Sequence, residues 1–232
     1  MNETTSGSYK HAFEQAQEML KAGDFELALS QIDAIIEVHP RDAKTSLLKG
    51  VAFRHLGRHE KAVDILQRLA QATEGVAAVH QELGFSLYAL FRVEEAIDAL
   101  RAAVKIDSKL AASWALLGEL LYLADEEEQA EEAFRQQLAA SHRHPGIIKA
   151  LDLIRQERYG MAEGICRDYL KRHPDDVTVI RLLAEIGIKL GVREDPETLL
   201  KQCLKLAPDY HFARNTYAIA LGKANKYKQA LA

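Results

Sequence analysis

The chain has little of what marks secreted, membrane or nucleic-acid-binding proteins. Its only two cysteines, Cys166 and Cys203, fall on apolar helix faces and are expected to be small buried hydrophobic residues, not a disulfide framework. The 30 Lys and Arg against 34 Asp and Glu residues give a net charge of -4, without the basic excess that favours nucleic acid or an anionic membrane. The polar start MNETTSGSYK and the lack of a long apolar run argue against a signal peptide and a membrane span. We therefore expect a cytoplasmic protein with no nucleic-acid or membrane partner.

Motifs of catalysis and cofactor binding are also missing. The chain has neither a phosphate loop of the GxxxxGK[ST] type nor a GxSxG nucleophile elbow. His142 and His144 are the closest pair among nine histidines, but alternate residues on a helix point apart and no third ligand has a suitable spacing, so a polar loop is the favoured interpretation. The acidic run EEEQAEEA at 126–133 is expected to begin a helix, where carboxylates complement the helix dipole. The sequence thus predicts no catalytic residue, no cofactor and no metal site.

What the chain does contain is a small residue that recurs with a fixed period. The first series is Ala16, Gly50, Gly84, Gly118, Ala150, Ala184 and Ala218, at spacings of 34, 34, 34, 32, 34 and 34 residues. A second series follows twelve residues later at Ala28, Ala62, Ala96, Ala130, Ala162 and Ala230, with Pro196 out of pattern. Each period holds two amphipathic stretches separated by a short break, which indicates a helical hairpin. Close helix crossing explains the small residues, because a larger side chain would hold the two backbones apart.

The hairpins are expected to begin near residues 9, 43, 77, 111, 143, 177 and 211, after a disordered segment at residues 1–8. Gly23, Gly57 and Gly191 stand just after a first helix, where a left-handed residue is common. Prolines end the second helices, and Asp42 and Asp176 follow as candidate N-caps. With Trp114 at the fourth place and prolines at the thirty-second (Pro40, Pro174 and Pro208), the pattern resembles the tetratricopeptide repeat. The resemblance spans residues 9–232 and implies an all-α, right-handed superhelix of about seven hairpins, the last truncated.

Departures from the period locate the irregular places. Where the spacing falls to 32, Pro145 and Gly146 occupy the expected start of a first helix, which should therefore be short. Pro196 replaces the usual alanine and is tolerated only in a first turn, so its helix should begin near Asp195. The sequence stops a few residues into the last second helix, as if cut from a longer protein. The apolar face left there, including Tyr217, Leu221 and Leu231, is expected to permit self-association.

The tetratricopeptide resemblance implies a concave groove lined by the first helices, which binds a protein or peptide. Carried onto this sequence, the positions that face the groove give these candidate binding residues: Phe13, Gln17, Arg54, His55, Gln81, Phe85, Tyr88, Glu119, Tyr122, Arg181, Phe212 and Asn215. The middle of the groove would be aromatic, with Phe85, Tyr88 and Tyr122 beside Arg54, a composition suited to anchoring a peptide. The alternative is that these aromatic side chains only fill the space between adjacent first helices.

A second resemblance rests on whole segments. The short fifth hairpin, RLLAEI in the sixth, and CLKLAPDYHFARNTYA across the next junction are similar to the N-terminal repeats of bacterial tetratricopeptide-repeat sulfotransferases. This resemblance implies that a protein-tyrosine-sulfotransferase-like domain follows residue 232 and that the repeats dock its substrate or a partner. No catalytic residue of that family can be placed within this chain. The alternative is an assembly scaffold with no attached enzyme.

Overall fold

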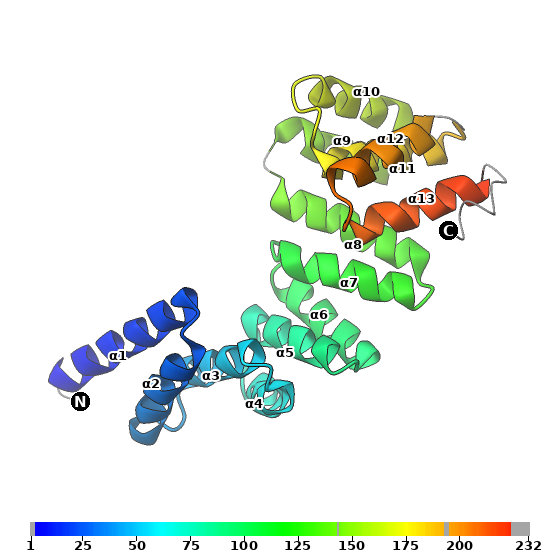
Figure 1. The fold of residues 1–232 in the computed structure, drawn as a ribbon. Coiled ribbons are helices and arrows are strands. Elements are labelled where there is room, and N and C mark those ends of the chain that lie inside the picture. The colour runs from blue at the N-terminus through cyan, green and yellow to red at the C-terminus, as the bar shows by residue number, and fades with distance from the viewer. Residues whose placement is uncertain (1–2, 143, 193–194, 224–232) are drawn as a thin grey trace. The chain divides into compact units, whose positions relative to one another are not determined.

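The computed structural model describes residues 3–142, 144–192 and 195–223, and all secondary structure within these ranges is α-helical (Figure 1). In chain order the helices are α1 (Glu3–Ala22), α2 (Phe25–Val38), α3 (Ala43–His55), α4 (His59–Ala72), α5 (Ala77–Ala89), α6 (Val93–Ile106), α7 (Ala111–Leu123), α8 (Glu127–Ser141), α9 (Pro145–Arg155), α10 (Tyr159–Leu170), α11 (Val177–Lys189), α12 (Asp195–Leu206) and α13 (His211–Lys223). The expected all-α array of helical hairpins is therefore confirmed.

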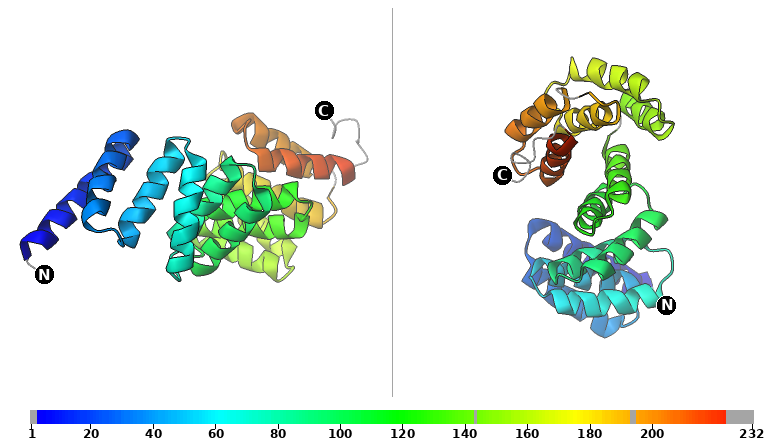
Figure 2. Two further views of the ribbon diagram at one scale, coloured as in Figure 1. Left: turned by 90° about the horizontal axis from the view of Figure 1, so that it is seen from below. Right: turned by 90° about the vertical axis from the view of Figure 1, so that its right-hand side faces the viewer.

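The helices pack mainly on their neighbours in sequence. α1 contacts α2, α3 contacts α4 and α5 contacts α6 within hairpins, while α2 contacts α3 and α4 contacts α5 between hairpins. Figure 2 shows these helices lying side by side in chain order. The sequence predicts one array over residues 9–232, whereas the contacts divide the chain into two compact units, Met1–Phe134 and Arg135–Ala232. We refer to them as unit 1 and unit 2 and describe each by itself.

The start of the chain differs from the expectation. α1 begins at Glu3, so residues 3–8 are helical and the disorder expected from their polar composition is wrong for this segment. Residues 1 and 2 lie outside the described part of the chain. Serine and threonine are weak but competent helix residues, and a helix continuing from residues 9–22 extends over them without a new nucleation step.

The turns between the two helices of a hairpin share a residue with a positive φ angle. Gly23, Gly57 and Gly191 have φ values of 87°, 71° and 74°, which confirms the left-handed glycines expected from the sequence. The corresponding places in the other described hairpins are taken by Phe91, Asp125 and Glu157, with φ values of 58°, 60° and 57°. The turn therefore keeps its geometry even where a side chain makes the left-handed conformation costly.

The small residues of the first series provide room for a large side chain of the paired helix. A Cβ atom added to Gly84 would lie 2.7 Å from Leu100 Cγ, and one added to Gly50 would lie 2.7 Å from Leu66 Cδ2. At Gly118 the same atom would lie 2.7 Å from the Phe134 ring. Leu66 and Leu100 are fully buried. The close helix contact inferred from the sequence is thus made by glycine against a buried leucine or phenylalanine.

Both irregular places follow the sequence expectation. α9 has 11 residues, against 13 in α7 and α11, and it begins at Pro145, whose missing N–H is not needed there. α12 begins at Asp195 and carries Pro196 in its first turn. Pro196 is buried, and its Cγ would lie 2.9 Å from a Cβ added to Gly187, so the ring packs directly on α11. The acidic run likewise opens α8, with Glu127 and Glu128 in the first turn.

Helix α11 forms the centre of unit 2. Every residue from Val179 to Gly187 is buried, a stretch of more than two turns, so all faces of the helix are covered there. One side packs in a cluster with Leu138, Ile147 and Cys166, and the other packs with residues that include Leu200, Cys203 and Ala213. Unit 2 is therefore built around a helix that would line an open surface in a regular array.

Two expectations about single residues concern this unit. Cys166 and Cys203 are fully buried free thiols, as expected, and burial raises the pKa of Cys166 to about 12 and that of Cys203 to about 11. Leu221 is only 1% exposed, so it is not part of an uncovered apolar face. Leu231, the other leucine assigned to that face, lies outside the described residues.

Across the described ranges, no helix combines the length and the apolar character needed to cross a membrane.

Candidate functional site

The candidate surface of unit 1 consists of residues on the first helices of its hairpins. Among them, Arg54 of α3 is held in place by contacts with two residues of α5. Its Nε donates a hydrogen bond of 2.6 Å to Glu82 Oε2 on α5, and its guanidinium lies 5.6 Å from the centre of the Phe85 ring. Both partners of the ion pair are largely shielded from water, with side-chain exposures of 22% and 16%. The contacts join α3 to α5 and hold the arginine in one place. Glu82 was not among the residues singled out from the sequence.

His55 stands next to Arg54 at the end of α3. Arg54 Nη2 lies 3.0 Å from His55 Nε2, and the imidazole stacks on Phe25 of α2 with ring centres 4.6 Å apart. Burial lowers the pKa of His55 and the charge of Arg54 lowers it further, against an opposing effect of Glu82. The ring is thus held neutral near pH 7, where it can accept a hydrogen bond from the guanidinium.

Among the tyrosines and phenylalanines of the candidate set, Tyr88 is the most exposed residue. It lies near the end of α5 and is 43% exposed, whereas Phe85, one turn earlier, is half-buried under Arg54. Phe91, in the turn that follows, is 88% exposed, and its backbone N–H bonds to the Tyr88 carbonyl oxygen at 2.9 Å. The sequence analysis did not single out Phe91. Its position in the repeat is equivalent to that of the turn glycines in other hairpins, and this equivalence could have identified it as a turn residue.

The other candidates of unit 1 are half-buried. Tyr122 of α7 has its pKa raised by burial and by the nearby charges of Glu127 and Asp125. Phe13 of α1 stacks on Tyr9 with ring centres 5.9 Å apart. Gln17, Gln81 and Glu119 complete the set at intermediate exposure. Half-buried rings fit both interpretations left open by the sequence, because such a ring fills space and still offers one edge.

In unit 2, two of the three candidate residues are buried. Arg181 and Phe212 are 2% and 5% exposed, so the expectation that they line an open groove is wrong. The Arg181 guanidinium packs 4.1 Å from the centre of the Phe212 ring, and Nη1 bonds to Glu185 Oε2 at 3.1 Å. Glu185 Oε1 also accepts a bond of 2.8 Å from Arg135 Nη1. Neighbouring helices therefore cover this face of α11, while Asn215 of α13 remains half-buried.

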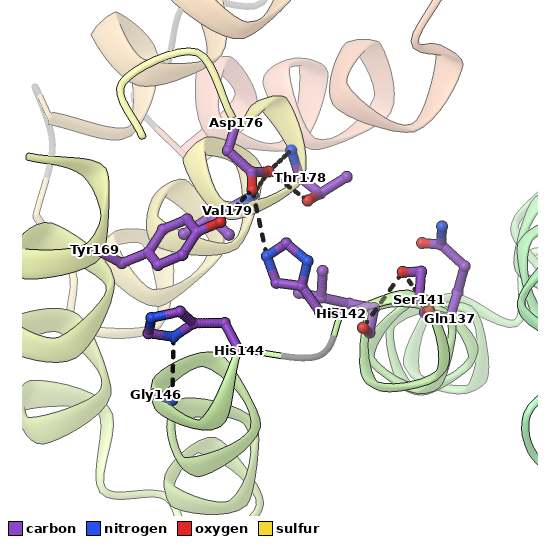
Figure 3. A network of polar contacts seen from close by, with 10 residues as sticks. Gln137, Ser141, His142, His144, Gly146, Tyr169, Asp176, Thr178 and Val179 are labelled. Carbon is purple, nitrogen blue, oxygen red and sulfur yellow. Dashed lines mark hydrogen bonds and ion pairs between the residues drawn. The ribbon is translucent and has the colours of Figure 1, made fainter. Parts of the chain in front are cut away.

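A polar network joins the ends of three helices in unit 2 (Figure 3). Asp176 caps α11, accepting bonds from the backbone N–H groups of Thr178 and Val179. The same carboxylate accepts a bond of 2.9 Å from Tyr169 Oη and lies 3.2 Å from His142 Nε2. Desolvation raises the pKa of Asp176, but the bonds from Thr178, Val179 and Tyr169 outweigh it and keep the pKa below its ordinary value. His142 is therefore a structural partner of the cap.

Trp114 lines a hollow of about 340 Å³ within unit 1, together with apolar residues of α6, α7 and α8. Its Nε1 donates a bond of 3.0 Å to the Ser108 carbonyl oxygen, so the indole ties α7 to the end of α6. The tryptophan therefore packs against its own hairpin and the preceding one.

Comparison with known proteins supports the repeat assignment. Two family models described as tetratricopeptide repeat match residues 13–77 and 77–110. TTC0263, a thermophilic tetratricopeptide-repeat protein of Thermus thermophilus, is similar over 92% of this chain and 98% of its own, with a TM-score of 0.53 and 18% identity. Residues 13–110 therefore match tetratricopeptide repeats, and the fold is similar to that of a solved tetratricopeptide-repeat protein.

Two further solved structures share this fold. MamA covers 82% of this chain and 93% of its own at a TM-score of 0.55 and 17% identity. YrrB, described as a tetratricopeptide-repeat protein with an unusual peptide-binding site, covers 87% and 88% at a TM-score of 0.56 and 15% identity. No curated protein matches the sequence. These findings do not support the resemblance to bacterial sulfotransferases.

Proposed function

We propose that the first-helix surface of unit 1 binds a peptide or an extended segment of a partner protein. The observation that carries the proposal is that Tyr88 is exposed one turn after Phe85, the ring that packs against an arginine already fixed by Glu82. A fixed arginine and an exposed tyrosine are typical of interface hot spots, because both offer large contact area and lose little conformational freedom on binding. Tetratricopeptide repeats are in general non-catalytic interaction modules, and the repeat neighbour YrrB is described as having a peptide-binding site.

The expected binding mode follows from the chemistry of this surface. Tyr88 and Tyr122 would contact apolar side chains of the partner, while remaining hydrogen-bonding capacity on Arg54 would meet a carbonyl or carboxylate oxygen. Because Glu82 already neutralises Arg54, the surface does not require a strongly acidic ligand. Gln17, Gln81 and Glu119 of unit 1 are polar residues that would bond to a peptide backbone, and they remain proposed contacts.

The proposal is tested with a random peptide library displayed on phage and selected on the whole chain. An enriched peptide is synthesised with a dye, and its affinity is measured by fluorescence anisotropy for Tyr88→Ala, Tyr122→Ala and Met161→Ala. Met161 is the matched control, since it is an exposed apolar residue of unit 2 at 51% exposure. Tyr88→Ala should weaken binding by about tenfold or more, equivalent to about 1.4 kcal/mol, and Met161→Ala should leave it unchanged. Equal affinity of wild type and Tyr88→Ala, with unchanged circular dichroism, contradicts the site.

A finer proposal concerns the protein that carries this module. Docking of substrate for a C-terminal sulfotransferase-like domain rests on the sequence resemblance alone, and a free-standing cytoplasmic scaffold is the rival. Sequencing the native reading frame past Ala232 separates them: a phosphosulfate-binding domain supports docking, and a stop after one capping helix supports the scaffold.

A further inference from the structure

An open hollow of about 540 Å³ lies in unit 2, and none of its lining residues belongs to the peptide surface proposed for unit 1. Its lining brings together the end of α10, the residues that follow it, and His144 at the start of α9. Tyr169 forms one wall, with its ring stacked on His173 at 4.5 Å between centres and edge-on to His144 at 4.9 Å. Figure 3 shows Tyr169 lying between Asp176 and His144.

Tyr169, His173 and Asp176 have a structural role, which a comparison with an equivalent segment of unit 1 identifies. The sequence His39-Pro40-Arg41-Asp42 recurs as His173-Pro174-Asp175-Asp176. In the first copy Tyr9 packs edge-on to His39 at 5.0 Å and donates a hydrogen bond of 2.8 Å to Asp42. In the second copy Tyr169 stacks on His173 and donates the corresponding bond to Asp176. The tyrosine, histidine and aspartate therefore serve to cap the next first helix in both places.

The cationic residues of the hollow, Lys171 and Arg172, are not part of this helix cap. Lys171 and Arg172 of the second copy correspond to Glu37 and Val38 in the first, so the cap forms without them. Lys171 Nζ is bonded to Asp168 at 2.7 Å. Within the described part of the chain, Arg172 forms no ion pair; its charge helps to lower the pKa of Asp168, but less than the hydrogen bond and charge of Lys171 do. The hollow thus holds two full positive charges and two histidines against one carboxylate that is already paired.

His144 adds a hydrogen-bond donor of fixed orientation. Its Nδ1 accepts a hydrogen bond of 3.2 Å from the Gly146 backbone N–H, so Nδ1 carries the lone pair and the ring proton resides on Nε2. The hollow is lined by the Nε2–H group of His144, the guanidinium of Arg172 and the imidazole of His173. Oxyanions typically bind to donors of these kinds.

We propose that this hollow binds a phosphate group, with Arg172 as the main charge, His144 and His173 as further donors, and Tyr169 as the wall against which the rest of the ligand packs. The site is independent of the peptide surface of unit 1. The same chemistry is offered by free phosphate and by a phosphorylated organic group, and the volume admits either.

The test follows the Cε1–H signals of His144 and His173 by NMR while inorganic phosphate, phenyl phosphate or benzoate is added to the whole chain. Single substitutions of each histidine by glutamine assign the two signals. Both phosphate ligands should shift these signals with saturation, and benzoate should bind at least about tenfold more weakly, because it carries less charge and fewer oxygens. Tighter binding of phenyl phosphate would identify a phosphorylated organic group, and equal binding would identify free phosphate.

Arg172→Gln should weaken phosphate binding at least about tenfold. Arg155→Gln is the matched control: it removes the same charge from an exposed arginine of α9 that is paired with Asp152 and does not line the hollow. If Arg172→Gln does not fold, as judged by circular dichroism, His144→Gln takes its place. An equal loss for Arg155→Gln, equal binding of benzoate, or no saturation in the millimolar range overturns the proposal.

Discussion

The guanidinium carbon of Arg181 lies 4.1 Å from the centre of the Phe212 ring, and both side chains are almost completely buried. A charged group tolerates such burial only when it is paired, and Glu185 provides the partner at 3.1 Å. Arg181 and Phe212, which the tetratricopeptide resemblance assigns to a ligand-binding groove, therefore contact each other inside unit 2. Ligand binding to first helices is proposed only for unit 1.

Arg181→Met should destabilise the chain by about 2 to 3 kcal/mol, because Glu185 loses one of its two arginine partners while remaining buried. Urea unfolding followed by circular dichroism measures the change. Arg155→Met, an exposed arginine with 63% of its side chain accessible, is the control and should alter the free energy of unfolding by less than about 0.5 kcal/mol. A loss at Arg181 no larger than that of the control would show that the buried pair contributes little.

Phe91→Gly should stabilise the chain by about 0.5 to 1 kcal/mol. The left-handed conformation at φ 58° strains a residue with a side chain, and the ring is 88% exposed, so little packing is lost with it. Gly57→Ala, at the same place in another hairpin, should have the opposite effect of about 1 kcal/mol. Thermal unfolding of the two variants provides the comparison, and a change of the same sign in both would refute the explanation.

Gly84→Ala should destabilise the chain by about 1 to 3 kcal/mol, since the new methyl group would lie 2.7 Å from Cγ of Leu100, which is fully buried. Gly164→Ala is the matched control within α10, because a Cβ there meets no atom within 4 Å. That variant should be stabilising by up to about 1 kcal/mol through helix propensity. Unfolding free energies in urea distinguish the two, and equal effects would contradict the steric role of Gly84.

Asp176→Ala should cost about 1 to 2 kcal/mol at pH 7, where the carboxylate caps α11 and accepts the Tyr169 bond. Its pKa is lowered from 3.8 in the folded chain, so the ionised group adds stability above that value, and this stability is lost as pH falls through the folded pKa. The difference between wild type and variant should therefore shrink in acid.

Measuring unfolding free energy from pH 7 to pH 2 tests this expectation. Asp175→Ala removes a neighbouring exposed carboxylate that makes no cap, and it should show no such pH-dependent difference from wild type. A difference between wild type and Asp176→Ala that stays constant down to the lowest pH would contradict a cap carried by the charged form.

The sequence by itself determined the repeat, the hairpins and most of their boundaries. Period and turn chemistry are local properties, so Gly23 and Gly57 adopt the left-handed turn, Asp42 and Asp176 cap their helices, and Pro145 shortens α9 as the residues predict. Contacts between residues far apart in the chain were decided by the tertiary structure alone. A periodic position specifies the face of a helix, but it does not specify whether another helix covers that face. For this reason Tyr88 is exposed on α5, while Arg181, at a first-helix position that the repeat also assigns to the groove, is sealed beneath Phe212.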